Sequence, residues 1–166
     1  MILYSSDTGA PSNITNTTGS FLSVLDYCLV QMGWTIEFTG TNKRVYKQQS
    51  PYDKLIRVDD SNTTYSNIVI YNSMSDIDTG VNPTPNASQQ ANGIFYPKIN
   101  NSAWIVCGDG KQFFVYQSET PSINPTNLPR STFFVSSGGV SAPSLLTISG
   151  YTSQFAGASN TGMKNS

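Results

Sequence analysis

Residues 104–116, WIVCGDGKQFFVY, place two short apolar runs on either side of a Gly-Asp-Gly-Lys tetrapeptide. Trp104–Cys107 and Gln112–Tyr116 are rich in the β-branched and aromatic residues that strands favour. The Asp-Gly dipeptide between them is typical of a type I′ turn. The stretch therefore predicts an antiparallel hairpin, and we expect Gly93–Tyr96 to pair alongside it.

Residues 20–32, SFLSVLDYCLVQM, have a helical period instead. Apolar residues recur there at spacings of three and four, at Phe21, Leu25, Cys28, Leu29 and Met32. Ser20 can cap the start of a helix, and Gly33 suits a left-handed stop. The pattern predicts one amphipathic helix whose apolar face lies on a sheet.

A period of two marks the other strands. Trp34, Ile36 and Phe38 alternate with polar residues, which predicts a half-buried strand. Similar runs predict strands at Arg44–Gln48, Leu55–Val58, Ile68–Tyr71, Thr132–Ser136 and Leu145–Ser149. Met74–Asn92 is polar with two prolines and predicts a long surface loop, a kind of segment that is usually functional or disordered.

These elements predict an α+β fold: mainly antiparallel β-sheet, sandwich or barrel-like, with one helix near residues 20–32 packed on it. The chain has 166 residues, about one domain's length. We expect a single β-rich domain over residues 1–150. Residues 151–166 are small and polar, and we interpret them as a C-terminal tail available as an assembly arm.

The composition excludes several function classes. Charged residues make up 11% of the chain, against about 25% in an average protein. Lys plus Arg (9) nearly balances Asp plus Glu (10), which argues against a nucleic-acid partner. No apolar run reaches the roughly 18 residues of a membrane span, and no signal-like segment opens the chain. We therefore expect neither a nucleic-acid nor a membrane partner.

The chain contains no histidine, which removes Ser-His-Asp and Cys-His nucleophile pairs and histidine metal sites. Asn, Ser and Thr supply about a third of the residues and cover the surface without charge. Such a surface favours a protein that works packed against other subunits. Cys28 and Cys107 are predicted to be reduced thiols, although a disulfide between them stays open.

Acidic motifs have several interpretations. Asp7-Thr8-Gly9 and Asp78-Thr79-Gly80 match the triplets of aspartic proteases, but Asp-Thr-Gly is also a good turn. Asp76-Ile77-Asp78-Thr79 matches the nucleophile signature of aspartyl-phosphate phosphatases, which need a buried parallel strand that this pattern does not predict. Asp59, Asp60, Asp76 and Asp78 could surround calcium, although solvated loop acids are the favoured interpretation. We therefore assign no catalytic, cofactor-binding or metal residue and expect no cofactor.

Neighbouring aromatic residues give a further expectation. Phe113-Phe114 and Phe133-Phe134 must each place one ring on either face of a sheet. An outward ring marks a second packing surface, such as a subunit contact. Outward aromatics flanked by Asp and Asn would instead favour a sugar-binding platform.

Five segments in order carry a resemblance: Tyr4–Pro11, Leu25–Val30, Gly33–Tyr46, Arg57–Asp60 and Met74–Gly80. Together they resemble a little-characterised family of virion structural proteins of tailed bacteriophages, encoded among head and tail morphogenesis genes. The similarity covers roughly residues 1–116, and the family has no catalytic motif to carry over.

The resemblance implies a non-enzymatic structural subunit located in the virion. We expect it to assemble in symmetric copies, as a homo-oligomer, on the capsid or at the head–tail junction, with capsid, neck or tail subunits as partners. Met74–Asn92 and the C-terminal tail are the expected contact segments. The alternatives are a tail component or carbohydrate-binding adhesin module, and an aspartyl-type hydrolase.

Overall fold

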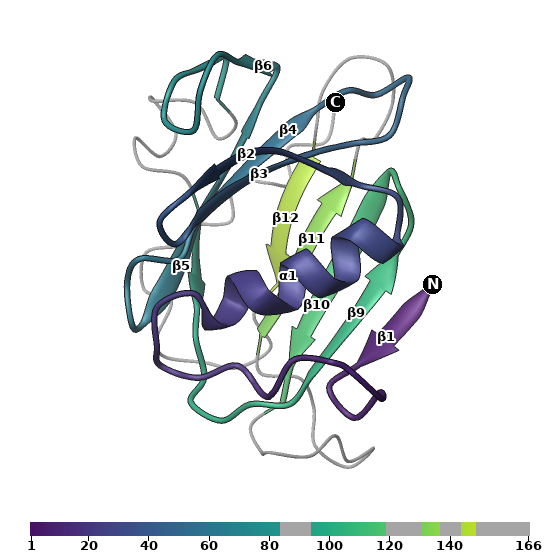
Figure 1. Ribbon diagram of the computed structural model, residues 1–166, viewed down its shortest axis with the longest axis vertical. Coiled ribbons are helices and arrows are strands. Elements are labelled where there is room, and N and C mark those ends of the chain that lie inside the picture. Colours follow the sequence, from purple (N-terminus) through teal and green to yellow (C-terminus); the bar gives the residue numbers. More distant parts are fainter. Residues whose placement is uncertain (84–93, 119–130, 137–143, 149–166) are drawn as a thin grey trace.

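Among the residues that the computed structural model describes, one helix and two five-stranded antiparallel sheets share a hydrophobic core (Figure 1). The structure describes residues 1–83, 94–118, 131–136 and 144–148, and it describes the side chains of residues 1–83 and 95–118. The predicted fold class, α+β and mainly antiparallel β, is confirmed. Both sheets are open, so the barrel-like alternative is wrong.

The helix α1 spans Ser20–Gln31 and agrees with the predicted helix. Its apolar face is fully buried at Phe21, Leu25, Cys28 and Leu29, among others. Gly33 adopts the expected left-handed conformation directly after the helix, with φ of 91°.

The predicted Ser20 cap is wrong. The N-cap is Gly19, with φ of 78°, and Ser20 Oγ donates to the carbonyl of Thr15 instead. A carboxylate from another part of the chain takes over the capping: Asp60 Oδ2 accepts the N–H groups of Phe21 and Leu22 at 3.0 and 3.3 Å. An acceptor brought in by the fold therefore satisfies the helix N-terminus.

The first sheet, called sheet 1, has the order β1-β9-β10-β11-β12. Its strands are β1 (Ile2–Tyr4), β9 (Trp104–Gly108), β10 (Gln112–Gln117), β11 (Ser131–Ser136) and β12 (Ser144–Ile148). This confirms the predicted strands at residues 104–107, 112–116, 132–136 and 145–149 to within a residue or two. Figure 1 shows β1 at one edge of the sheet, beside β9.

The hairpin between β9 and β10 forms as predicted, but its turn is not type I′. Such a turn needs positive φ at both central residues, and neither Asp109 nor Gly110 has it. Asp109 Oδ1 instead accepts the N–H groups of Lys111 and Gln112 at 2.8 and 3.0 Å. The aspartate side chain thus stabilises the turn through hydrogen bonds, and the turn does not need a glycine with positive φ.

The second sheet, called sheet 2, has the order β2-β3-β4-β5-β8. Its strands are β2 (Thr35–Gly40), β3 (Lys43–Lys47), β4 (Leu55–Asp59), β5 (Tyr65–Tyr71) and β8 (Ile94–Pro97). β8 pairs with β5, so the expectation that Gly93–Tyr96 lies alongside the 104–116 hairpin is wrong. Residues 94–97 join the other sheet, where Tyr96 is completely buried.

The edge strand β2 departs from the predicted half-buried pattern. A register irregularity lies between Ile36 and Phe38, and Ile36 is 40% exposed. Trp34, which precedes the strand, is the buried anchor at 2% exposure. The bulge breaks the alternation that the sequence suggested.

The predicted loop Met74–Asn92 is partly a small hairpin. β6 (Ser73–Met74) pairs with β7 (Gly80–Val81), and Arg57 Nε on sheet 2 donates to the carbonyl of Ile77 in the turn at 2.8 Å. Residues 84–92 of the predicted loop and the tail 151–166 lie outside the described residues.

The β9–β10 turn fastens the two sheets together. Its three consecutive carbonyl oxygens, from Asp109 to Lys111, accept hydrogen bonds from residues next to sheet 2. The donors are Trp34 Nε1 to Asp109, the Gln49 N–H to Gly110, and Gln48 Nε2 to Lys111. Sheets 1 and 2 are thereby joined beside the core.

Candidate functional site

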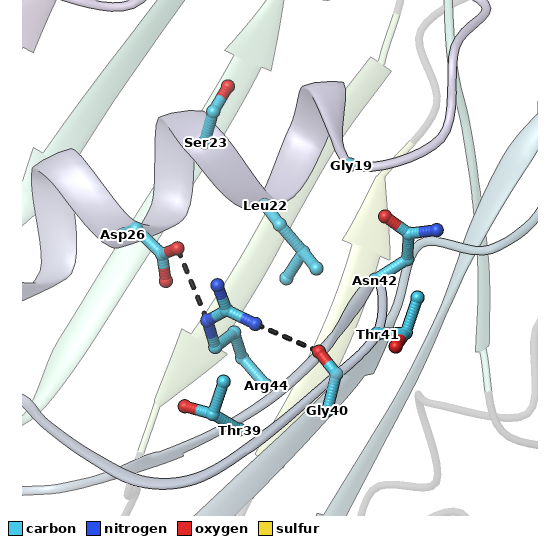
Figure 2. A pocket seen from close by; sticks show the side chains of 9 residues that line it. All are labelled: Gly19, Leu22, Ser23, Asp26, Thr39, Gly40, Thr41, Asn42 and Arg44. Atoms are coloured by element: carbon cyan, nitrogen blue, oxygen red, sulfur yellow. Dashed lines mark hydrogen bonds and ion pairs between the residues drawn. The ribbon is translucent and has the colours of Figure 1, made fainter.

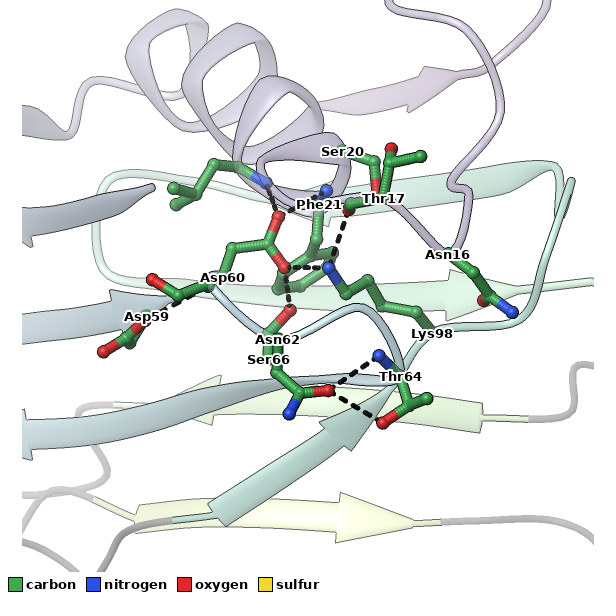
Figure 3. A network of polar contacts seen from close by, with 12 residues as sticks. Asn16, Thr17, Ser20, Phe21, Asp59, Asp60, Asn62, Thr64, Ser66 and Lys98 are labelled. Atoms are coloured by element: carbon green, nitrogen blue, oxygen red, sulfur yellow. Dashed lines mark hydrogen bonds and ion pairs between the residues drawn. The ribbon is translucent and has the colours of Figure 1, made fainter. Parts of the chain in front are cut away.

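Asp60 is the centre of a buried polar network (Figure 3). Besides capping α1, its carboxylate accepts Ser66 Oγ at 2.6 Å and pairs with Lys98 Nζ at 2.6 Å. Lys98 also donates to the carbonyl of Thr17 at 2.8 Å. Since both charged side chains are fully buried, Asp60 is not the solvated loop acid that the sequence suggested. The network connects the start of α1 to sheet 2 and therefore has a structural role.

A second acidic group lies on the outer side of sheet 2. Lys43 Nζ and Arg57 Nη2 both donate to the Asp78 carboxylate, the former at 2.8 Å. Arg57 Nη2 also lies 3.2 Å from Asp59. Hydrogen bonds from Lys43 and then Arg57 lower the pKa of Asp78 below its usual value. Asp59 and Asp78 are therefore both engaged in ion pairs with cationic side chains of sheet 2.

The four aspartates proposed for calcium do not converge. Asp60 points into the buried network, and Asp59 and Asp78 face cations. Asp76 accepts the N–H of Asp78 within the β6–β7 turn at 2.8 Å. In the part of the chain that the structure describes, no three His, Cys, Asp or Glu side chains group as metal ligands.

The two Asp-Thr-Gly triplets both form turns. Asp7 follows β1 of sheet 1, where its Oδ2 accepts the Tyr4 N–H at 2.7 Å. Asp78 lies against sheet 2, so the two carboxylates do not form the proton-sharing pair of an aspartic protease. The phosphatase-like stretch around Asp76 lies in an antiparallel hairpin, not at the end of a buried parallel strand.

An open hollow of about 550 Å³ lies between α1 and the β2–β3 turn (Figure 2). Its one ion pair joins Asp26 Oδ2 and Arg44 Nε at 3.3 Å, and Tyr46 donates to the other Asp26 oxygen at 2.7 Å. Hydroxyl and amide groups of Ser23, Thr39, Thr41 and Asn42 complete the polar lining. The hollow has little net charge and offers hydrogen bonds to a neutral polar group. Nothing in the sequence pattern pointed to it.

The outer face of sheet 1 is apolar in two rows across three strands. The first row is Ile2, Cys107 and Phe114, and the second is Tyr4, Ile105 and Tyr116, each set being in register. All six side chains are half-buried or exposed, whereas the alternating residues between them face the core. None of the six is charged. This outer face is the candidate interface of the protein.

The two outward rings on β10 form the centre of this face. Phe114 and Tyr116 stack with their centroids 6.3 Å apart and their planes 16° from parallel. Phe113, by contrast, is fully buried, which confirms that the Phe-Phe pair places one ring on each side. In the backbone register, Phe134 of β11 is paired with Phe114, and Leu146 of β12 is paired with Phe134. The side chains of Phe133 and Phe134 lie outside the described set.

Both cysteines are free, as expected. Cys28 is completely buried, and burial raises the pKa of its thiol to about 12, with a smaller contribution from Asp7. Cys107 lies half-buried on the outer face of sheet 1, where burial also raises its pKa. The disulfide left open by the sequence is not formed.

Comparison of the chain with protein-family profiles, with curated proteins and with solved structures gave no match. Among the described residues, no helix combines the length and the apolar character needed to cross a membrane.

Proposed function

We propose that this chain is a non-enzymatic structural subunit of a tailed-phage virion, assembling in symmetric copies on the capsid or at the head–tail junction. The resemblance of five ordered segments suggests this class of protein. The observation that carries the proposal is the apolar outer face of sheet 1, formed by Ile2, Tyr4, Ile105, Cys107, Phe114 and Tyr116.

An uncharged apolar sheet face favours burial against another protein surface. Contiguous exposed apolar surface typically marks an interaction site, and aromatic residues are enriched where interfaces are buried. With 11% charged residues, the chain has few charges to steer or repel a partner. Contacts would then come from apolar burial and backbone hydrogen bonds, with virion proteins as partners.

The same rings could also suggest a carbohydrate-binding adhesin, but their neighbours argue against it. A sugar platform needs polar side chains beside the ring to bind hydroxyl groups. On β9, Phe114 and Tyr116 are paired in register with Cys107 and Ile105, which offer little or no such bonding, and on β11 their partners in register are Phe134 and Thr132. The residues beside the two rings therefore favour a protein partner over a glycan ligand.

The test is incorporation of a Phe114→Asp variant into particles of the phage that encodes the chain, measured by quantitative mass spectrometry of purified virions. We expect the wild-type chain to be present in a fixed copy number and the variant to fall at least ten-fold. Val30→Asp is the matched control, because Val30 is an apolar residue 51% exposed on α1. It should incorporate normally.

Three results would overturn the proposal: absence of the wild-type chain from purified particles, normal incorporation of Phe114→Asp, or an equal loss in the Val30 control. Binding of the isolated chain to a glycan array, lost in Phe114→Asp, would support the adhesin instead.

A further inference from the structure

The edge strand β1 exposes part of its backbone. Met1 and Gly108 exchange two hydrogen bonds, at 2.7 and 2.9 Å, and the Ser5 N–H donates to Trp104 at 3.0 Å. Because alternate residues of an antiparallel strand face the partner strand, Met1, Leu3 and Ser5 direct their peptide groups toward β9. Those of Ile2 and Tyr4 point away from the sheet.

Only one of these two outward residues keeps its peptide groups open. Tyr4 is satisfied locally: its N–H donates to Asp7 Oδ2 at 2.7 Å, and its carbonyl accepts the Asp7 N–H at 3.1 Å. Within the described residues, the N–H and C=O of Ile2 have no partner. The edge therefore offers one donor and one acceptor, side by side on a single residue.

Apart from the Asp7 turn at Tyr4, β1 has none of the usual edge protections among the described residues. Proteins usually block exposed edges with charges, prolines or bulges. The edge strand β2 of sheet 2 has a bulge between Ile36 and Phe38 and the exposed charge of Glu37. β1 has no bulge, charged side chain or proline, and its residue Ile2 is 57% exposed.

We propose that β1 pairs with β1 of a second copy of this chain, antiparallel about a two-fold axis at Ile2. The Ile2 N–H of each copy then donates to the Ile2 carbonyl of the other, which closes both open groups. The open edge consists of the peptide groups of Ile2 alone, because the Asp7 turn already occupies those of Tyr4. Two such edges satisfy each other completely. A longer strand from another protein would also lie against Tyr4, and its peptide groups there would have no partner.

The side chains support the same arrangement. Residues directly opposite in an antiparallel pair lie on the same face, so Ile2 of one copy lies beside Ile2 of the other. The row Ile2–Cys107–Phe114 then continues into the same row of the second copy. Since no side chain of the row is charged, doubling it places no like-charged side chains opposite each other. The inference rests on the proposed structural role and extends it by naming the partner.

The test uses two variants of the full chain, Ile2→Lys and Ile2→Glu, in sedimentation experiments up to about 1 mM. We expect wild type to dimerise with increasing concentration. Each variant alone should associate at least ten-fold more weakly, because opposite residues of such a pair have Cα atoms about 5.5 Å apart and like charges would meet. An equimolar mixture should restore association as a mixed dimer.

Val30→Lys is the control, since it places the same charge on an exposed apolar residue of α1 and should leave the dimer unchanged. Circular dichroism melting should show both Ile2 variants folded, because most of this side chain is exposed. A wild type that stays monomeric, single variants that still dimerise, or a mixture that does not recover would overturn the edge pairing. These sedimentation experiments use the isolated chain and do not measure incorporation into particles, so the proposed function is judged separately by the particle experiment.

Discussion

The Lys98 ammonium lies 2.6 Å from Oδ1 of Asp60, and neither side chain is exposed to solvent. Lys98 follows β8, Asp60 follows β4, and the other Asp60 oxygen caps α1. One ion pair thus joins the start of the helix to two parts of sheet 2. Buried pairs of this kind are costly to break, because the remaining charge has no water around it.

Asp60→Asn should therefore lower the free energy of unfolding by about 3–5 kcal/mol, measured by urea denaturation. Asp59→Asn is the matched control, because its side chain is 23% exposed, and it should cost within about 1 kcal/mol. Equal losses at the two positions would contradict the role assigned to Asp60.

Trp34→Phe should lower the free energy of unfolding by about 1–3 kcal/mol beyond the loss of buried ring area. The indole Nε1 donates to the Asp109 carbonyl at 2.7 Å, and phenylalanine removes that donor from the join between the sheets. Trp104→Phe provides the comparison, since Trp104 is equally buried but its hydrogen bond to Ser12 is long, at 3.4 Å. Thermal melting that ranks Trp104→Phe as the more damaging change would refute the importance of this hydrogen bond.

Burial of Cys28 predicts a loss of stability in alkali. Its thiol has a pKa raised from 9.0 to about 12 in the folded chain, so the folded state holds a proton that the unfolded state releases. The free energy of unfolding should fall as pH rises from 9 to 12, by at most about 1.4 kcal/mol per pH unit from this group. In Cys28→Ala the free energy of unfolding should depend less steeply on pH between pH 9 and 12. If urea titrations at several pH values give the same slope as in wild type, Cys28 is not the group responsible.

Asp78 should fasten the β6–β7 hairpin to sheet 2. Asp78→Asn weakens its pairing with Lys43 and Arg57, so hydrogen exchange of residues 73–81 should speed up by about two- to five-fold at neutral pH. Because the pKa of Asp78 is lowered in the fold, this contribution is present above the unfolded value near 3.9 and is lost as pH falls through the folded value.

Asp53→Asn is the matched control for this exchange experiment. Asp53 is similarly exposed, but a single lysine faces it at 3.8 Å. Its substitution should leave the exchange of residues 73–81 unchanged. If Asp78→Asn has no more effect than this control, the ion pairs do not hold the hairpin.

The proposed assembly through the outer face of sheet 1 should tolerate salt. Apolar and backbone contacts lose little to screening, whereas charge-driven contacts weaken as the Debye length falls to about 3 Å at 1 M. We expect particles to keep this chain when washed in 1 M salt at constant pH, as measured by mass spectrometry of the pelleted virions. Its release in moderate salt would indicate an electrostatic interface.

Much of the fold could be predicted from local patterns. The helix, the hairpin at residues 104–116 and most strands follow from the spacing of apolar residues, because periods of 3.6 and 2 directly reflect helix and strand geometry. That Phe113 and Phe114 lie on opposite faces followed in the same way, whereas the structure decided that Phe114 is the outward ring. The turn at Asp109 did not, since its side chain competed with the type I′ geometry that Asp-Gly favours.

The sequence by itself determined the helix and most of the strands, the small number of charges, and the absence of histidine. Only the tertiary structure decided that residues 94–97 join sheet 2, that Asp60 is buried against Lys98, and that Ile2 keeps an open peptide group at a sheet edge. Local preferences act within a few residues along the chain. Strand partners, buried ion pairs and edges instead depend on which distant residues share the core, and that is settled when the whole chain packs.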